Sequence, residues 1–232
     1  MRGRESKRAV RGARIKHSTP GLVCPPLPAL PAAAGGDRVF VPQGYEPAYD
    51  YPLLVWLPDA ARPFDLGRTM ARTSLRNFVA VEPAAGADVE ARVWRAVERV
   101  RDRWSIHPRR IYLAGVGTGG SAAFRIACRA PDACGGVVSL GGPFPLDEGL
   151  FAAADRVRRL PMLLCLRHDA AAAATSHVDR VLRLFHAAGA TLSLRLYAGH
   201  DDHARAMLAD VNRWLMQDVC GAAANVPARC AP

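Results

Sequence analysis

The stretch of the sequence best suited to chemistry is a run of small residues, Gly115 to Gly120, that follows a short apolar segment. Gly115 and Gly119 flank a central position at the spacing of the motif Gly-x-Ser-x-Gly. In that motif a strained turn between a strand and a helix projects a nucleophilic serine, so its neighbours must be small. Here the central residue is Gly117, which has no side chain that could form an acyl intermediate. The stretch therefore predicts a sharp turn of this kind without its nucleophile.

The same letters allow a second interpretation. Gly115, Gly117 and Gly120 also satisfy Gly-x-Gly-x-x-Gly, the phosphate-binding turn of dinucleotide sites. That fingerprint normally opens the first strand-helix-strand unit, whereas several strand patterns precede it here. The next predicted strand, Val137 to Leu140, does not end in the Asp or Glu that would bind a ribose. We therefore favour the nucleophile-type turn, keep the phosphate-binding turn and a plain tight turn as alternatives, and expect no cofactor.

Around this turn the chain alternates short apolar runs with longer segments of helical period. This is the pattern of an α/β fold, in which helices cover both faces of a parallel sheet. The predicted strands are Arg38 to Pro42, Pro52 to Leu57, Asn77 to Val81, Ile111 to Ala114, Gly136 to Leu140, Pro161 to Leu166 and Leu192 to Tyr197. The predicted helices are Phe64 to Leu75, Asp88 to Trp104, Gly120 to Arg129, His177 to Ala188 and His203 to Val219, with His107-Pro108 ending the second.

The block from His107 to Gly142, which reads HPRRIYLAGVGTGGSAAFRIACRAPDACGGVVSLGG, resembles the α/β-hydrolase superfamily. Within that superfamily it is most similar to the carboxylesterases and phospholipase-type esterases. The resemblance implies the α/β-hydrolase fold, a mostly parallel central sheet with helices on both faces in a three-layer sandwich. It also implies a small ester or acyl compound as the ligand.

In that superfamily three features accompany the nucleophile: an oxyanion loop after an early strand, an acid after a late strand, and a histidine before the last helix. The oxyanion loop corresponds to Pro58 and Asp59. Proline has no N–H to donate, and the Asp59 carboxylate would oppose developing negative charge. We favour the interpretation that Asp59 caps its own turn. Thr118, beside the nucleophile position, belongs to the same oxyanion region and is not expected to project as a nucleophile would.

The resemblance places the acid and the histidine late in the chain. Ala171 stands where the acid is expected, and Asp169 lies two residues early, so Asp169 could serve only in a remodelled loop. His203 occurs in a stretch similar to the family's Tyr-Pro-Gly-x-x-His, one position beyond simple register, and His200 is the alternative. Either histidine could equally be a solvent-facing residue at a helix start.

Ser121 is the candidate for a displaced nucleophile, because Gly119 and Ala123 flank it in a similar small-residue frame. It lies four residues beyond the centre of the turn, so we expect it to be inside the following helix already. The segment from Pro143 to Arg159 is the expected lid, with Phe144 and Val157 among its large apolar residues.

The net charge of +10 is concentrated at one end of the chain. Residues 1 to 16 carry seven Arg or Lys against one Glu, and a Pro- and Ala-rich stretch follows to residue 36. We expect residues 1–36 to be a disordered tail and linker, residues 37–221 to form one domain, and residues 222–232 to form a C-terminal tail. The basic tail is either a solvated segment or an arm for nucleic acid or lipid, and the folded part carries no pattern for specific nucleic-acid binding.

The six cysteines are scattered, without the spacing of a metal site or a disulfide framework. Cys128 and Cys165 lie in apolar patterns typical of buried thiols, which favours a cytoplasmic location. We expect no signal peptide and no membrane span, because the prolines between residues 25 and 31 interrupt the apolar stretch that such segments need.

Three functions remain open from the sequence. The first is a catalytically degraded esterase that keeps the fold and binds a small ligand in the former cleft. The second is an active ester or thioester hydrolase that uses Ser121, or an unconventional arrangement of His203 and Asp169. The third is an interaction protein that acts through its basic tail.

Overall fold

The computed structural model describes residues 36–146, 150, 154–167, 171–197 and 203–220. These residues form a seven-stranded sheet in the order β1-β3-β2-β4-β5-β6-β7. β1 pairs antiparallel with β3, and the remaining neighbours pair in parallel. The strands are β1 (Arg38–Phe40), β2 (Tyr51–Leu57), β3 (Val79–Glu82), β4 (Ile106–Val116), β5 (Gly136–Leu140), β6 (Met162–Arg167) and β7 (Leu192–Tyr197).

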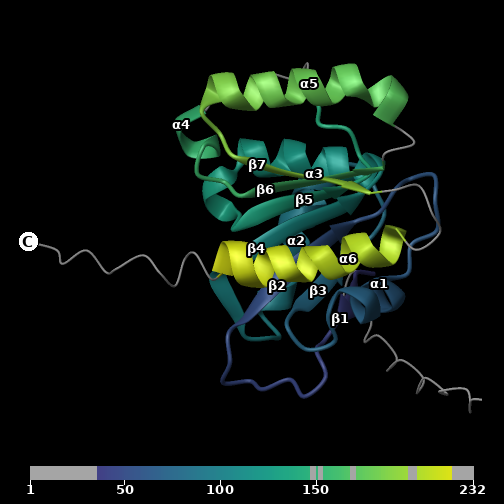
Figure 1. The fold of residues 1–232 in the computed structure, drawn as a ribbon. Coiled ribbons are helices and arrows are strands. Elements are labelled where there is room, and N and C mark those ends of the chain that lie inside the picture. Colours follow the sequence, from purple (N-terminus) through teal and green to yellow (C-terminus); the bar gives the residue numbers. More distant parts are fainter. Residues whose placement is uncertain (1–35, 147–149, 151–153, 168–170, 198–202, 221–232) are drawn as a thin grey trace, which may run out of the picture.

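Helices cover both faces of this sheet (Figure 1). The helices are α1 (Leu66–Thr73), α2 (Val89–Arg101), α3 (Thr118–Arg129), α4 (Ala154–Val157), α5 (Ala171–Ala188) and α6 (His203–Arg213), followed by a π-helical segment, Trp214–Cys220. Buried side chains of α2, α3 and α5 join the core on one face, and those of α1 and α6 join the core on the other. The expected three-layer α/β arrangement is therefore confirmed.

The two cores arise from the alternation of side chains along the central strands. In β2, Leu53 and Val55 enter the core under α2 and α3, whereas Leu54 and Trp56 enter the core under α1 and α6. All seven residues of β2 are buried, as expected for a strand covered on both faces. The continuous apolar run that predicted this strand is thus explained by burial on both sides.

The register of the strands brings three loops to one edge of the sheet. Leu57 is paired with Gly115, and Val116 with Leu140, so β2, β4 and β5 end at nearly the same level. Pro58, Gly117 and Gly141 therefore follow at neighbouring positions on the carboxyl edge. This edge is where ligands bind in open parallel sheets.

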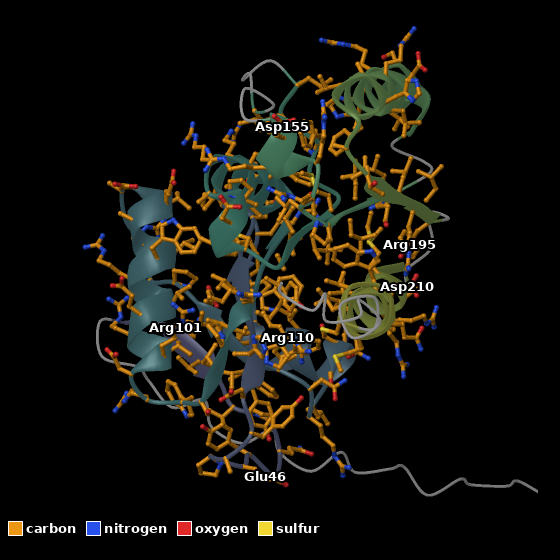
Figure 2. The ribbon with its side chains drawn as sticks, turned by 90° about the vertical axis from the view of Figure 1, so that its left-hand side faces the viewer. Glu46, Arg101, Arg110, Asp155, Arg195 and Asp210 are labelled. Carbon is orange, nitrogen blue, oxygen red and sulfur yellow. The ribbon has the colours of Figure 1, made fainter. Side chains whose placement is uncertain are left out.

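Helix α6 is anchored against β7 by polar contacts as well as by its apolar side. Asp210 accepts a hydrogen bond of 2.7 Å from the Tyr197 hydroxyl and lies 3.3 Å from the Arg195 guanidinium. Figure 2 shows Arg195 and Asp210 close together at the side of the molecule. These contacts fix the helix that begins at His203.

Several predicted boundaries are wrong for identifiable reasons. His107 and Pro108 do not end a helix but lie in the long strand β4, because α2 already ends at Arg101. Helix α5 begins at Ala171, six residues before the predicted start at His177. Alanine has the highest helix propensity, so the alanine run joins the helix instead of forming a loop.

The prediction that the segment from Pro143 to Arg159 forms a lid is wrong for Phe144 and Val157. Phe144 is 1% exposed and packs between Phe124 and Phe185, with ring centroids 4.9 Å and 5.0 Å away. Val157 is buried in the same core. Both side chains stabilise the packing of α3 and α5 instead of covering a cleft.

Burial in the double core predicts a clear difference between two leucines. Leu54 is fully buried in β2, whereas Leu196 on the edge strand β7 is 52% exposed. We expect Leu54→Ala to lower the free energy of unfolding by about 2–5 kcal/mol, because it removes buried methyl groups and leaves a cavity. Leu196→Ala should cost less than about 1 kcal/mol. Urea denaturation measures both, and equal losses would contradict the assigned layers.

Candidate functional site

The residue at the centre of the predicted motif lies on a sharp turn between β4 and α3. Gly117 has φ +54° and ψ −124°, a backbone conformation that side-chain-bearing residues rarely adopt. Its N–H donates to the carbonyl of Leu140 at 2.9 Å, and its carbonyl accepts from the N–H of Gly120 at 3.0 Å. The turn is therefore held both by the neighbouring strand and by the first turn of α3.

The flanking glycines allow an unusually close approach of backbone segments. A Cβ atom on Gly115 would lie 2.2 Å from the carbonyl oxygen of Gly119. A Cβ atom on Gly119 would lie 2.1 Å from the carbonyl oxygen of Leu57. Since neither distance is sterically possible, both positions require glycine for β2, β4 and α3 to meet here.

Asp59, the second residue after β2, reaches across to the start of α3. The Thr118 hydroxyl donates to Asp59 Oδ1 at 2.9 Å and accepts from the N–H of Ala60 at 3.2 Å. The N–H of Ala61 also donates to Asp59 Oδ1, at 3.3 Å. Asp59 therefore caps its own turn and at the same time links the loop after β2 to α3.

These donors stabilise the charged form of Asp59. The Thr118 hydroxyl and then the N–H of Ala61 are the main causes that hold the pKa of this carboxyl below its ordinary value. The guanidinium of Arg62 and the backbone N–H of Thr118 lower the pKa further by smaller amounts. Because this negative charge faces the first turn of α3, it opposes phosphate binding at the same place.

The Asp59 carboxylate occupies the space that a side chain at position 117 would need. A Cβ atom built on Gly117 would lie 2.4 Å from Asp59 Oδ2 and 2.8 Å from its carboxylate carbon. The missing side chain and the aspartate are therefore sterically coupled. A side chain at position 117 therefore requires the Asp59 carboxylate to move or to be removed.

A hollow of about 220 Å³ lies in front of the turn, which we call the elbow hollow. Its wall comes from the carboxyl ends of β4, β5 and β6, the loop after β2, and α6. The residues that line it are Asp59, Arg62, Val116, Gly117, Leu140, Gly141, Arg167 and Met207. The carboxyl edge predicted for the cleft thus carries a hollow with Asp59 and Gly117 in its wall.

The predicted catalytic residues are only partly placed. His203 is the first residue of α6, about one helical turn before Met207, which lines the elbow hollow. Asp169 and His200 lie outside the described residues, and so does the side chain of His203. Ala171, expected at the position of the acid, opens helix α5.

Ser121 lies within the first turn of α3 and is not among the residues that line the elbow hollow. It is 7% exposed, and its hydroxyl donates to the carbonyl of Pro143 at 2.6 Å. A serine nucleophile needs an accessible oxygen and a base that accepts its proton. The hydroxyl of Ser121 is instead buried and committed to a backbone carbonyl.

A second hollow of about 480 Å³ lies beside the first, which we call the β3 hollow. It is formed by the ends of β2 and β3 and the starts of α2 and α3, and the Asp59–Thr118 contact separates it from the elbow hollow. The residues that line it are Leu57, Pro58, Ala60, Glu82, Pro83, Ala85, Gly86, Val89, Arg92, Thr118, Gly119 and Ala122. Glu82 and Arg92 were not among the residues predicted for a site. Glu82 is a charged residue at the end of a buried strand, and that combination could have identified it.

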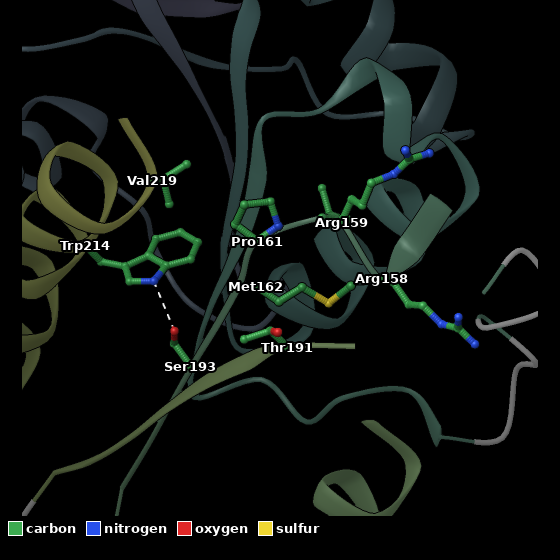
Figure 3. A pocket seen from close by; sticks show the side chains of 9 residues that line it. Arg158, Arg159, Pro161, Met162, Thr191, Ser193, Trp214 and Val219 are labelled. Atoms are coloured by element: carbon green, nitrogen blue, oxygen red, sulfur yellow. Dashed lines mark hydrogen bonds between the residues drawn. The ribbon is translucent and has the colours of Figure 1, made fainter. Parts of the chain in front are cut away.

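A further hollow of about 240 Å³ lies far from this edge, at the amino ends of β6 and β7 (Figure 3). Trp214 forms one wall, and its indole N–H donates to the Ser193 hydroxyl at 3.2 Å. Figure 3 shows the guanidinium groups of Arg158 and Arg159 extending away from Trp214. The hollow lies at the edge opposite the turn, and the polar residues among those that line it are Arg158, Arg159, Thr191 and Ser193.

Within the described residues, no group of three or more His, Cys, Asp or Glu side chains could hold a metal ion. Among the same residues, none of the helices combines the length and apolar character needed to cross a membrane. Burial raises the pKa of the thiols of Cys128 and Cys165 to about 12, so both remain protonated near neutral pH.

Known proteins resemble this chain in structure and not in sequence. No model of a protein family matches the chain, and no curated protein matches it either. A thermostable esterase superposes with a TM-score of 0.60 at 16% identity, over 80% of this chain and 58% of the esterase. The feruloyl esterase module from Clostridium thermocellum, solved with sinapinate, has a TM-score of 0.60 at 13% identity, over 79% of this chain and 85% of the module.

A fluorophosphonate-binding serine hydrolase from Staphylococcus aureus gives a similar result. Its TM-score is 0.58 at 12% identity, over 82% of this chain and 94% of the hydrolase. Identities this low show a shared fold and leave the activity open. The chain therefore has the α/β-hydrolase fold, as the resemblance of its turn region predicted.

The contact between positions 117 and 59 predicts a non-additive effect on stability. Gly117→Ala should lower the free energy of unfolding by about 1–3 kcal/mol through backbone strain alone, and further through the clash with Asp59. Gly44→Ala is the control, because Gly44 also has positive φ (+72°) but open space around its Cβ position. In an Asp59→Gly background the cost of Gly117→Ala should fall to the part that comes from backbone strain alone. A cost unchanged by Asp59→Gly would contradict the contact.

The lowered pKa of Asp59 predicts a pH-dependent contribution to stability. A carboxyl whose pKa is lower in the folded state stabilises that state above its unfolded pKa of about 3.9, and this contribution disappears as the pH falls through the folded value. Asp59→Asn should therefore destabilise the protein at neutral pH and make little difference at strongly acid pH. Urea denaturation across this range measures the change, with Asp102→Asn on the exposed turn after α2 as the control for losing one charge. If the stability difference between Asp59→Asn and the unaltered protein grew on acidification, the lowered pKa of Asp59 would be refuted.

Proposed function

We propose that this protein binds a small ligand at the carboxyl edge of its sheet and does not hydrolyse esters. The observation that carries the proposal is the position of Asp59, whose carboxylate lies where the side chain of a nucleophile at position 117 would stand. An ester carbonyl could not approach the turn without meeting this negative charge. The protein would then be a catalytically degraded relative of the esterases that share its fold.

Electrostatics supports the same proposal. Ester hydrolysis on this fold needs N–H groups that stabilise a developing oxyanion, usually from the loop after an early strand and from the residue after the nucleophile. Here that loop begins with Pro58, which has no N–H. The residue after the turn is Thr118, whose hydroxyl and N–H already stabilise the Asp59 carboxylate. The region that would stabilise an oxyanion thus contains a permanent anion of the protein itself.

The alternative of a displaced active site receives less support. The hydroxyl of Ser121 is buried and donates to Pro143, so a substrate would have to open the first turn of α3 to reach it. An arrangement of His203 with Asp169 depends on side chains outside the described residues. The basic tail, residues 1–35, also lies outside them, and the folded part offers no observation that favours an interaction function.

The proposal is tested with a p-nitrophenyl ester and a fluorophosphonate probe. We expect the unaltered protein to show neither turnover nor labelling, and Ser121→Ala to behave identically. Gly117→Ser alone should also remain unlabelled, because its side chain meets the Asp59 carboxylate. Combining Gly117→Ser with Asp59→Gly removes that obstacle, so labelling at position 117 is expected only in the double variant.

Two results would count against this proposal. Turnover by the unaltered protein that disappears in Ser121→Ala would establish a displaced nucleophile. Labelling of Gly117→Ser without any change at Asp59 would show that the carboxylate does not block the turn.

A further inference from the structure

A hollow of about 460 Å³ at the amino edge of the sheet has a wall rich in basic side chains, and we call it the basic hollow. The residues that line it are His107, Arg109, Arg110, Tyr112, Cys134, Gly135, Arg159, Pro161, Val219 and Cys220. Among these described residues none is acidic. Arg159, Pro161 and Val219 also line the hollow drawn in Figure 3, so the two spaces adjoin. The volume of the basic hollow is within the range of small-molecule sites.

Most of the basic side chains come from a bulge near the start of β4. Between two positions at which β2 and β4 pair, β4 has four residues, 107–110, where β2 has only Pro52. Extra residues of this kind leave the ladder and turn their side chains in new directions, and such bulges are common beside functional sites. This bulge supplies His107, Arg109 and Arg110 to the wall of the basic hollow.

The bulge is fixed by contacts of its own backbone. Nη2 of Arg101 donates to the carbonyl of Pro108 at 3.0 Å, and the N–H of Arg109 donates to Nδ1 of His107 at 3.2 Å. A Cβ atom on Gly135 would lie 2.7 Å from the carbonyl oxygen of Arg109, so a glycine is needed for the turn before β5 to lie against the bulge. Because these contacts hold the wall in place, a ligand would bind with a smaller entropic cost.

The charges of this wall select an anion. Among the described residues, no hydrogen bond or ion pair engages the guanidinium group of Arg109 or of Arg159, and both side chains are exposed to solvent. The floor is uncharged near neutral pH, because burial and then the contact with Cys220 raise the pKa of Tyr112. Arg110 adds a third cation to the same space. An anion would relieve the repulsion between these cations, whereas a cation would increase it and a neutral molecule would leave it unchanged.

The positive charge without a partner ends at the hollow on the side of α4. Arg156 lies 3.3 Å from the carboxylate of Asp132, and Arg158 lies 3.3 Å from that of Asp155. Nucleic acid is bound by an extended basic stripe that follows a line of phosphates. A group of cations around one concave space instead suits a compact anion that carries more than one charge.

We propose that the basic hollow binds a small phosphate monoester with an apolar substituent. The phosphate accepts hydrogen bonds from the guanidinium groups of Arg109, Arg110 and Arg159, since guanidinium matches phosphate in charge and in geometry. The substituent lies against Pro161 and Val219, whose side chains are partly exposed in the same wall. This site is at the edge opposite the ligand site proposed above and does not depend on it.

Phenyl phosphate is the probe, in titrations of the full chain followed by amide NMR signals. We expect saturable shifts at Gly135 and Val219. Benzoate, with a single negative charge, should bind about threefold to tenfold more weakly, and benzamide and benzylamine more weakly still. Inorganic phosphate should also bind more weakly, because it lacks the apolar substituent. Absence of saturable shifts with phenyl phosphate, or equal or tighter binding of any of the four other compounds, would overturn the proposal.

Variants from two separate elements locate the site. Arg109→Gln on β4 and Arg159→Gln before β6 should each weaken phenyl phosphate binding about threefold to tenfold, because each removes a charged donor. Arg109→Lys keeps the charge and should restore most of the affinity. Arg68→Gln on the exposed face of α1 is the control for losing one positive charge and should leave binding unchanged.

A thermal melt of each variant identifies any that fails to fold, and the two glutamine variants are independent, so either one tests the site. Binding that survives both glutamine substitutions, or that Arg68→Gln weakens as much, would overturn the assignment to the basic hollow. A single-stranded oligonucleotide provides the remaining comparison. If it shifts Gly135 and Val219 at lower concentration than phenyl phosphate does, the small-ligand proposal is overturned in favour of nucleic acid.

Discussion

The close backbone contact between the end of β2, the end of β4 and the start of α3 determines the arrangement of the whole carboxyl edge. Gly115 and Gly119 allow this contact, because a Cβ atom at either position would lie within 2.2 Å of a carbonyl oxygen. The contact brings the loop after β2 against the first turn of α3 and forces the turn at Gly117. Both hollows at this edge are consequences of that packing. A larger residue at either flanking position would separate the strand from the helix and remove the geometry on which they depend.

On this scaffold Asp59 takes the place of the missing side chain at position 117. Its carboxylate gains hydrogen bonds from Thr118 and Ala61, which favour its charged form and link the loop to the helix. The same contact divides the edge into two spaces, one in front of the turn and one behind Thr118. An aspartate unfavourable for ester hydrolysis is thus favourable for the structure, because it fills a space that would otherwise be empty and satisfies donors at the start of α3.

The order of strands and helices could be predicted from the sequence, because each core strand is an apolar run and each covering helix has an apolar stripe of helical period. The strands β5 and β7 were predicted with their boundaries, and the turn at Gly117 with its position. Other features depended on contacts between distant segments. His107 and Pro108 extend β4 because Ile106 pairs with Tyr51 of β2, and Phe144 is a core residue because Phe124 and Phe185 meet it from two helices. Local patterns contain no information about such partners.

The sequence by itself determined that the chain has an α/β fold with a glycine-rich turn and that no nucleophile stands at the centre of that turn. These conclusions follow from residue types and their spacing along one segment. Only the tertiary structure decided that Asp59, far away in sequence, occupies the space beside Gly117, that Ser121 is buried against Pro143, and that Glu82 and Arg92 line one hollow. The physical reason is that each of these depends on the register of parallel strands and the close approach of a helix, which bring together side chains whose separation along the chain does not indicate contact.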